Sequence, residues 1–179
     1  FKKPIILSTG LINLSEIKRL INQFSDRKNK KNFGLLHCVS KYPALNKDLN
    51  LKSISFLKKK FPHYEIGYSD HSLNIDSCKI AMNLGAFMIE KHFTLDKNFS
   101  NFHDHKISAN PHELKDLVDF SNNLKLMLGD MKKVPKKDEI KNILNLRRSA
   151  YFKKDLKIGS QFSPNDINWL RPIKKLSIN

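Results

Sequence analysis

Residues 64–93, YEIGYSDHSLNIDSCKIAMNLGAFMIEKHF, contain one complete β-α-β unit. The apolar run at 64–69 predicts a buried strand, and the run at 86–93 predicts another. Between them, residues 75–84 predict a helix that Gly85 closes. A helix connecting two apolar strands is typical of a parallel sheet that is covered by helices.

The same alternation extends on both sides of this unit. Further strands are predicted at 4–8 and 34–39, and further helices at 14–24, 50–60 and 111–128. Four βα units predict an α/β fold that is either the second half of a (β/α)8 TIM barrel or an incomplete doubly wound sheet. No GxGxxG or GxxxxGK[ST] motif is present, which disfavours a nucleotide-binding sheet.

A change in composition divides the chain. We expect residues 1–130 to form the partial barrel and residues 131–146 to form a charge-rich linker. Residues 147–179 resemble the opening of a small β-rich module, with Gly159 and Pro164 in turns. This last segment is too short to close a hydrophobic core alone.

The composition excludes several classes of protein. Hydrophobic residues make up 40% and charged residues 28%, which excludes a disordered or collagen-like chain. No stretch approaches the roughly 20 apolar residues of a membrane-spanning helix, and the first residues show no signal-peptide pattern. Cys38 and Cys78 do not make a disulfide framework. We therefore expect a cytoplasmic protein with two buried cysteines and no membrane partner.

The net charge of +16 raises nucleic acid as a partner. Only five of the 33 basic residues are arginines, however, and the lysines are spread along the chain. A nucleic-acid groove would favour arginine interleaved with aromatic residues. The pattern therefore favours a solvated lysine surface.

Polar and ionisable side chains gather at all four predicted strand ends. These ends are Ser8-Thr9-Gly10, Ser40-Lys41-Tyr42, Ser69-Asp70-His71 and Glu90-Lys91-His92. Function sits at the carboxyl ends of strands in both candidate folds. His71 and His92 would follow neighbouring strands, and two neutral imidazoles suit a divalent metal with positions left for water and substrate. The alternative is two histidines that are held only by hydrogen bonds.

The other histidines carry weaker signals. Residues 103–105, His-Asp-His, fall on a long polar loop, where such a segment can bind a metal but is more often a surface cluster. The length of the loop favours a lid or a substrate-binding role. His37 lies within a predicted strand and is expected in the core. His63 and His112 stand near helix ends and are expected to face solvent.

Five segments resemble, in their order and spacing, the bacterial sialic acid synthase family, which includes N-acetylneuraminate, legionaminate and pseudaminate synthases. The segments are KPIILSTG (3–10), LLHCVSKYP (35–43), IGYSDHS (66–72), GAFMIEKHFTLDK (85–97) and DHKIS (104–108). Residues 147–172 resemble the start of the family's antifreeze-like (SAF) domain. The combination of SDH with EKHFT about 20 residues later is highly specific.

The resemblance implies a (β/α)8 barrel joined by a linker to the SAF domain, of which this chain matches strands five to eight and the SAF opening. It implies condensation of phosphoenolpyruvate with N-acetylmannosamine or a related amino sugar, giving a nine-carbon sialic acid and phosphate for cell-surface glycans. A legionaminate or pseudaminate synthase would take a dideoxy-diacetamido sugar instead. A rival of another class is an inactive fragment or a carbohydrate- or nucleic-acid-binding module. We expect the half barrel alone to be inactive.

Site residues follow from the resemblance by position. His71 and His92 match the family's two metal ligands, with Mn²⁺ or Mg²⁺ as the expected ion. Three hydroxyls stand where the family contacts phosphoenolpyruvate: Ser8, Ser40 and Ser69.

The remaining matches concern the amino sugar. Tyr42 and Asp104 match catalytic residues that contact it, and Arg171 matches an arginine that the SAF domain inserts into the neighbouring subunit's site. The last match implies a domain-exchanged homodimer. The loop departs from the family's Gly-Pro-Asp-His, because residues 102–105 are Phe-His-Asp-His. The family's phosphate-binding lysines and catalytic glutamate belong to the first half of the barrel.

Overall fold

The computed structural model describes residues 3–24 and 33–171. The chain divides into two compact units, Phe1–Gly129 and Asp130–Asn179.

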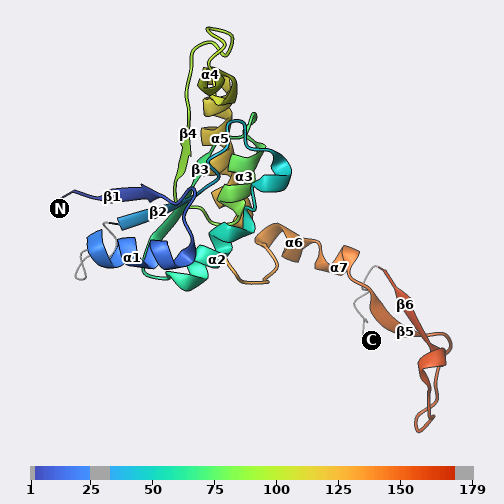
Figure 1. Ribbon diagram of the computed structural model, residues 1–179. Coiled ribbons are helices and arrows are strands. Elements are labelled where there is room, and N and C mark those ends of the chain that lie inside the picture. The colour runs from blue at the N-terminus through green and yellow to red at the C-terminus, as the bar shows by residue number, and fades with distance from the viewer. Residues whose placement is uncertain (1–2, 25–32, 172–179) are drawn as a thin grey trace. The chain divides into compact units, whose positions relative to one another are not determined.

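The first unit is built on a parallel sheet whose strands follow one another in chain order (Figure 1). The strands are β1 (Ile5–Ser8), β2 (Phe33–Cys38), β3 (Glu65–Asp70) and β4 (Ile89–Lys91). Each described neighbouring pair is parallel. A doubly wound sheet reverses its strand order at a switch point, so the sequential order favours the partial barrel among the two predicted folds.

Helices connect the strands and cover one face of the sheet. They are α1 (Leu14–Phe24), α2 (Lys52–Lys60), α3 (Asp76–Asn83) and, after β4, α5 (Pro111–Leu128). The short helix α4 (His103–Ile107) lies past the carboxyl end of β4 instead. Local signals start two of the helices: the Asn13 side chain accepts hydrogen bonds from the amides of Ser15 and Glu16, and Asn110 with Glu113 forms a capping box for α5.

The core lies between the sheet and these helices. Alternate residues of β2 and β3, such as Leu35 and Ile66, are buried against Ile54 of α2 and Cys78 of α3. Cys38 and Cys78 are both buried and unpaired, as predicted. A single helix-covered face explains why the core residues of each strand recur every second position.

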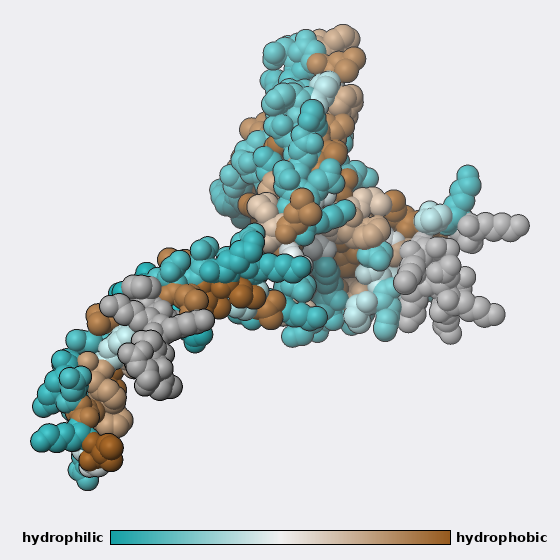
Figure 2. All heavy atoms as spheres, turned by 180° about the vertical axis from the view of Figure 1, so that it is seen from behind, coloured by the Kyte–Doolittle hydropathy of each residue, from teal (hydrophilic) through white to brown (hydrophobic). Residues whose placement is uncertain are grey.

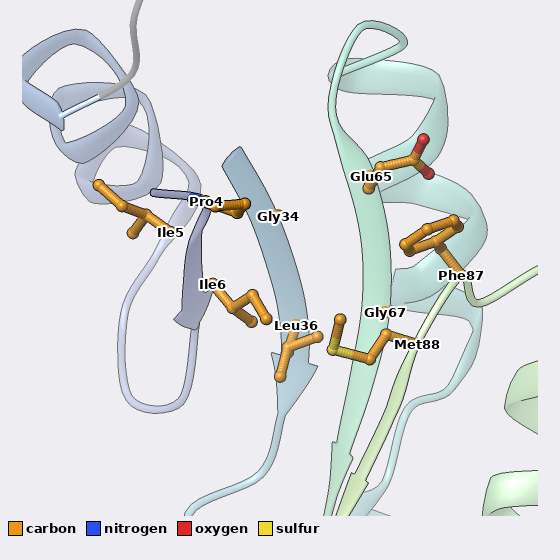
Figure 3. Close-up of a pocket in the computed structure, with 9 residues that line it drawn as sticks. All are labelled: Pro4, Ile5, Ile6, Gly34, Leu36, Glu65, Gly67, Phe87 and Met88. Atoms are coloured by element: carbon orange, nitrogen blue, oxygen red, sulfur yellow. The ribbon is translucent and has the colours of Figure 1, made fainter. Parts of the chain in front are cut away.

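The opposite face of the sheet forms an apolar pocket toward the amino ends of the strands. In Figure 3, Ile6 of β1, Leu36 of β2 and Met88, which precedes β4, point toward one another across Gly67 of β3. Gly67 allows this close packing, because a Cβ there would come within 2.6 Å of the Met88 carbonyl oxygen and 2.5 Å of Leu36 Cδ2. The pocket is lined almost wholly by apolar groups, so it offers few groups that could take part in a reaction.

Two elements differ from the predictions. The strand predicted at 86–93 is regular only over Ile89–Lys91, although Met88 still accepts a hydrogen bond from the Tyr68 amide of β3. The segment predicted as a polar loop contains the short helix α4. A helix of five residues is too short for an apolar periodicity to announce it.

The second unit contains α6 (Lys137–Lys141), α7 (Ile143–Leu146) and an antiparallel pair, β5 (Ser149–Phe152) with β6 (Ile167–Leu170). None of its described residues is buried. Phe162 and Trp169 are more than half exposed, and Figure 2 shows apolar side chains on the surface of this unit. A hairpin with so little burial does not close a core. Among the helices of the described ranges, none is both long and apolar enough to cross a membrane.

His37 is a buried core histidine, as predicted. Its Nε2–H donates to the Leu49 carbonyl at 2.8 Å, and its ring stacks on Tyr68. Burial lowers the pKa of His37 below its ordinary value, and the bond to Leu49 opposes this only in part.

This depressed pKa predicts an acid-sensitive stability. Between the folded-state pKa and about 6.5, the unfolded chain binds the extra proton, so the free energy of unfolding decreases as the pH is lowered through that window. In His37→Gln, which keeps a donor for Leu49, we expect a smaller loss between pH 7.5 and pH 5.5. Urea unfolding at both pH values measures the difference, and equal losses in the two proteins would contradict the assignment.

Candidate functional site

The candidate site lies at the carboxyl ends of β3 and β4. Asp70 and Lys91 are register partners in these parallel strands, so the next residues, His71 and His92, leave the sheet side by side. Their ring centroids are 5.4 Å apart, with 54° between the ring planes. The prediction that the two imidazoles lie together is confirmed.

His71 is held in one orientation by the backbone. Its Nδ1 lies 2.9 Å from the Val39 carbonyl oxygen, which can only accept, so Nδ1 carries the proton. The lone pair is therefore on Nε2. The side chain is also more deeply placed than a residue past a strand end suggests, because His71 is only 7% exposed.

Tyr42 lies beside three histidine rings. Its ring centroid is 4.1 Å from that of His71, 6.1 Å from that of His92 and 5.4 Å from that of His103. Burial raises the pKa of the Tyr42 phenol, and the charges of nearby acidic groups, including Asp104, raise it further. The phenol therefore stays protonated at neutral pH and is available as a donor.

Asp104 comes to the same place from α4. Its Oδ2 lies 3.8 Å from His92 Nδ1, which is too long for a hydrogen bond. Its Oδ1 is buried and makes no hydrogen bond among the described residues, although His103 Nε2 is 3.0 Å away. The Asp104 side chain is 34% exposed, so Oδ2 rather than the buried Oδ1 is the oxygen that a ligand can reach.

Helix α4 changes the interpretation of the His-Asp-His segment. His103 packs beside Tyr42, whereas the His105 ring turns away and lies 3.0 Å from the Thr94 hydroxyl. The three residues are therefore not one surface cluster. One turn of helix sends neighbouring side chains in different directions.

Ser69 has a partner that the sequence analysis did not single out. Its hydroxyl donates to Glu90 Oε1 at 2.7 Å, and the two residues are register partners. Glu90 stands two residues before His92, and alternate residues of a strand face the same side. The two-residue spacing between Glu90 and His92 is therefore the sequence signal that places Glu90 on the same side as the site.

The other two predicted serines lie at the ends of β1 and β2. Ser8 ends β1, and Ser40 follows β2; both are exposed. A Cβ built on Gly10 would overlap the Ser40 hydroxyl, so the β1 loop and Ser40 are in close contact. Arg171 is also exposed and follows β6 in the second unit.

A buried ion pair is formed by Asp70 and Lys91, the residues that directly precede the two histidines. Lys91 Nζ lies 2.5 Å from Asp70 Oδ2, and the side chains are 4% and 0% exposed. Burial alone would raise the pKa of Asp70, but the charge and hydrogen bond of Lys91, with bonds from Ser72 and Tyr68, outweigh it and hold the pKa below its ordinary value. The carboxylate is therefore ionised at neutral pH.

The donor set fits a divalent metal held by two protein ligands. Within residues 3–24 and 33–171, no group of three or more His, Cys, Asp and Glu is arranged to hold an ion. His71 and His92 nevertheless offer two imidazoles, and the bond from His71 Nδ1 to a backbone carbonyl is the arrangement typical of ligating histidines. Two ligands leave positions for water and substrate.

A parallel α/β sheet in sequential order, with ionisable groups gathered at strand carboxyl ends, is consistent with part of a TIM barrel. The family model described as the NeuB family matches residues 1–133. The chain belongs to the NeuB family.

Similar proteins agree with this assignment. The N,N'-diacetyllegionaminic acid synthase of Campylobacter jejuni is 44% identical over 98% of this chain and 52% of its own length. The pseudaminic acid synthase of the same organism is 39% identical over 96% of this chain and 49% of its own. A crystal structure of N-acetylneuraminic acid (sialic acid) synthetase from Leptospira borgpetersenii, in complex with citrate, has 41% identity and a TM-score of 0.69, covering 78% of this chain and 48% of that one. The chain thus spans about half the length of these relatives.

Proposed function

We propose that the complete protein containing this chain is a sialic-acid-type synthase. It condenses phosphoenolpyruvate with N-acetylmannosamine or a related amino sugar and releases phosphate. The observation that carries the proposal is the convergence of His71, His92 and Tyr42 at the carboxyl ends of the sheet in a chain whose relatives are named as such synthases.

Each group of the site has a task in this reaction. His71 Nε2 and the His92 ring would hold Mn²⁺ or Mg²⁺, which supplies Lewis-acid polarisation of the sugar aldehyde when bound. The protonated Tyr42 phenol donates to the amino sugar, and the exposed Oδ2 of Asp104 accepts from a sugar hydroxyl.

The serine hydroxyls act on the other substrate. Ser8 and Ser40 donate to the carboxylate or phosphate oxygens of phosphoenolpyruvate. The single proton of the Ser69 hydroxyl goes to Glu90 Oε1 in this structure, so Ser69 donates to the substrate only after leaving Glu90. Its C3 carbon attacks the sugar aldehyde, water adds at C2, and inorganic phosphate leaves. One phosphoenolpyruvate, one sugar and one water thus give one nine-carbon acid and one phosphate.

The direct test supplies the complete protein with phosphoenolpyruvate and a panel of amino sugars. The panel includes N-acetylmannosamine and dideoxy-diacetamido hexoses, since relatives named for legionaminic and pseudaminic acids are both similar. We expect chelator-sensitive phosphate release matched by a nine-carbon product with one panel member. Phosphate release with none of them would reject the synthase.

Gly10→Ala tests the role of Ser40. The new methyl group displaces the Ser40 hydroxyl, and losing one hydrogen bond of about 1 kcal/mol raises the KM for phosphoenolpyruvate by about fivefold to tenfold. Gly34→Ala is the matched control, because a Cβ there meets nothing closer than 3.7 Å. An unchanged KM in Gly10→Ala would remove Ser40 from the site.

We further propose that Arg171 acts in a partner subunit of a domain-exchanged homodimer. Mixing Arg171→Ala with His71→Ala should restore part of the activity, because one site of each heterodimer then receives both intact residues. No recovery, with subunit exchange verified separately, would show that Arg171 acts in its own subunit or not at all.

A further inference from the structure

The Asp70–Lys91 pair is unusual because it is almost completely enclosed. Besides its 2.5 Å contact with Asp70 Oδ2, Lys91 Nζ donates to the Ser72 carbonyl at 2.9 Å. The side chains are 4% and 0% exposed. A charged pair at this depth carries a large desolvation penalty, which its mutual attraction repays only with additional hydrogen bonds.

Those additional bonds fix the Asp70 carboxylate from several sides. Tyr68 donates its hydroxyl to Oδ1 at 2.8 Å, and the Ser72 amide donates to the same oxygen at 3.0 Å. The Ser72 hydroxyl donates to Oδ2 at 3.0 Å, and Cys78 Sγ is 3.5 Å from that oxygen. The carboxylate therefore has one position, and Lys91 is held against it.

In the sequence, each member of the pair directly precedes one of the two histidines. Asp70 precedes His71, Lys91 precedes His92, and Asp70 and Lys91 are register partners. Because successive residues of a strand point to opposite faces, the charged side chains lie on the helix side, against Cys78 of α3. They do not reach the substrate side, so their effect passes through the backbone of the strand ends.

Stability alone does not account for a pair in this place. Apolar residues of similar volume are often equal to or better than a buried ion pair in stability. A pair linking two strand ends, by contrast, fixes their separation and register. The two histidines extend from those ends, so their spacing depends on the link.

We propose that Asp70 and Lys91 are positioning residues that set the separation and orientation of His71 and His92 for metal binding. This inference rests on the proposed function, because it takes the two histidines as metal ligands. Supporting residues of this kind typically change metal affinity by about 10- to 100-fold when they are replaced.

The test measures Co²⁺ affinity and the visible absorption of bound Co²⁺ in the complete protein, with circular dichroism as the measure of folding. The double variant Asp70→Asn with Lys91→Met leaves no unpaired buried charge. We expect it to fold and to bind Co²⁺ about 10- to 100-fold more weakly, with an altered absorption spectrum. Lys97→Met is the matched control: it removes the Lys97–Glu113 ion pair of 2.7 Å and should change neither readout.

A second variant keeps the test decisive if the double variant does not fold. Asp70→Glu keeps both charges but displaces the carboxylate by one methylene, so affinity and spectrum should still change. Wild-type affinity and spectrum in either folded variant would overturn the positioning role. Absence of Co²⁺ binding in the unaltered protein, or binding that His71→Ala does not weaken, would instead reject the metal site and the proposed function with it.

Discussion

Replacing His71 with alanine is expected to lower the rate of metal-dependent condensation by about a thousandfold or more. A Lewis acid contributes several kcal/mol to stabilising the transition state, and each 1.4 kcal/mol is about tenfold in rate. His71 Nε2 carries the available lone pair, because Nδ1 donates to the Val39 carbonyl. The measurement is phosphate release from phosphoenolpyruvate with the accepted sugar, with and without added Mn²⁺.

The buried position of His71 calls for a variant that separates ligation from folding. His71→Gln keeps an amide donor for Val39 but replaces the imidazole by a much poorer metal ligand, so it should fold normally and be equally inactive. His37→Gln is the control, since His37 bonds a backbone carbonyl elsewhere in the core. Activity that survives in His71→Gln, or that is insensitive to chelator, would reject the assignment of the ligand.

Replacing Asp70 with alanine should cost about 3–5 kcal/mol of unfolding free energy, because it leaves the Lys91 charge buried without its partner. The exposed pair Lys41–Asp48 offers the comparison. Its side chains are 54% and 33% exposed, and water and salt screen such pairs. Asp48→Ala should therefore produce little measurable change in a urea titration. Equal losses of unfolding free energy in the two variants would show that the unpaired Lys91 charge does not carry the desolvation penalty that its burial implies.

The elements and the position of the site were accessible from the sequence because each depends on local pattern. Apolar runs such as GLLHCV marked the strands, and in a parallel sheet the strand ends meet at one edge. The neighbouring placement of His71 and His92 followed from that geometry alone. The family resemblance added the roles, which stay predictions; the structure shows only that Tyr42 lies against His71 and that Asp104 lies near His92.

The remaining features depend on register and on side-chain direction, which the sequence does not display. Asp70 and Lys91 are 21 residues apart, and nothing local shows that their side chains are buried as an ion pair on the helix side of the sheet. The same register brings Ser69 to Glu90. Helix α4 depends on tertiary packing, with Ile107 fully buried, since a single turn has little intrinsic stability.

The central claim is that His71 and His92 together hold one catalytic divalent ion. The most direct measurement is anomalous X-ray scattering at the manganese absorption edge from crystals of the complete protein grown with Mn²⁺. The account predicts one strong peak within bonding distance of His71 Nε2 and of the His92 ring, lost in crystals of His71→Gln. A peak elsewhere, or no peak in crystals of a protein whose activity requires Mn²⁺, would contradict it.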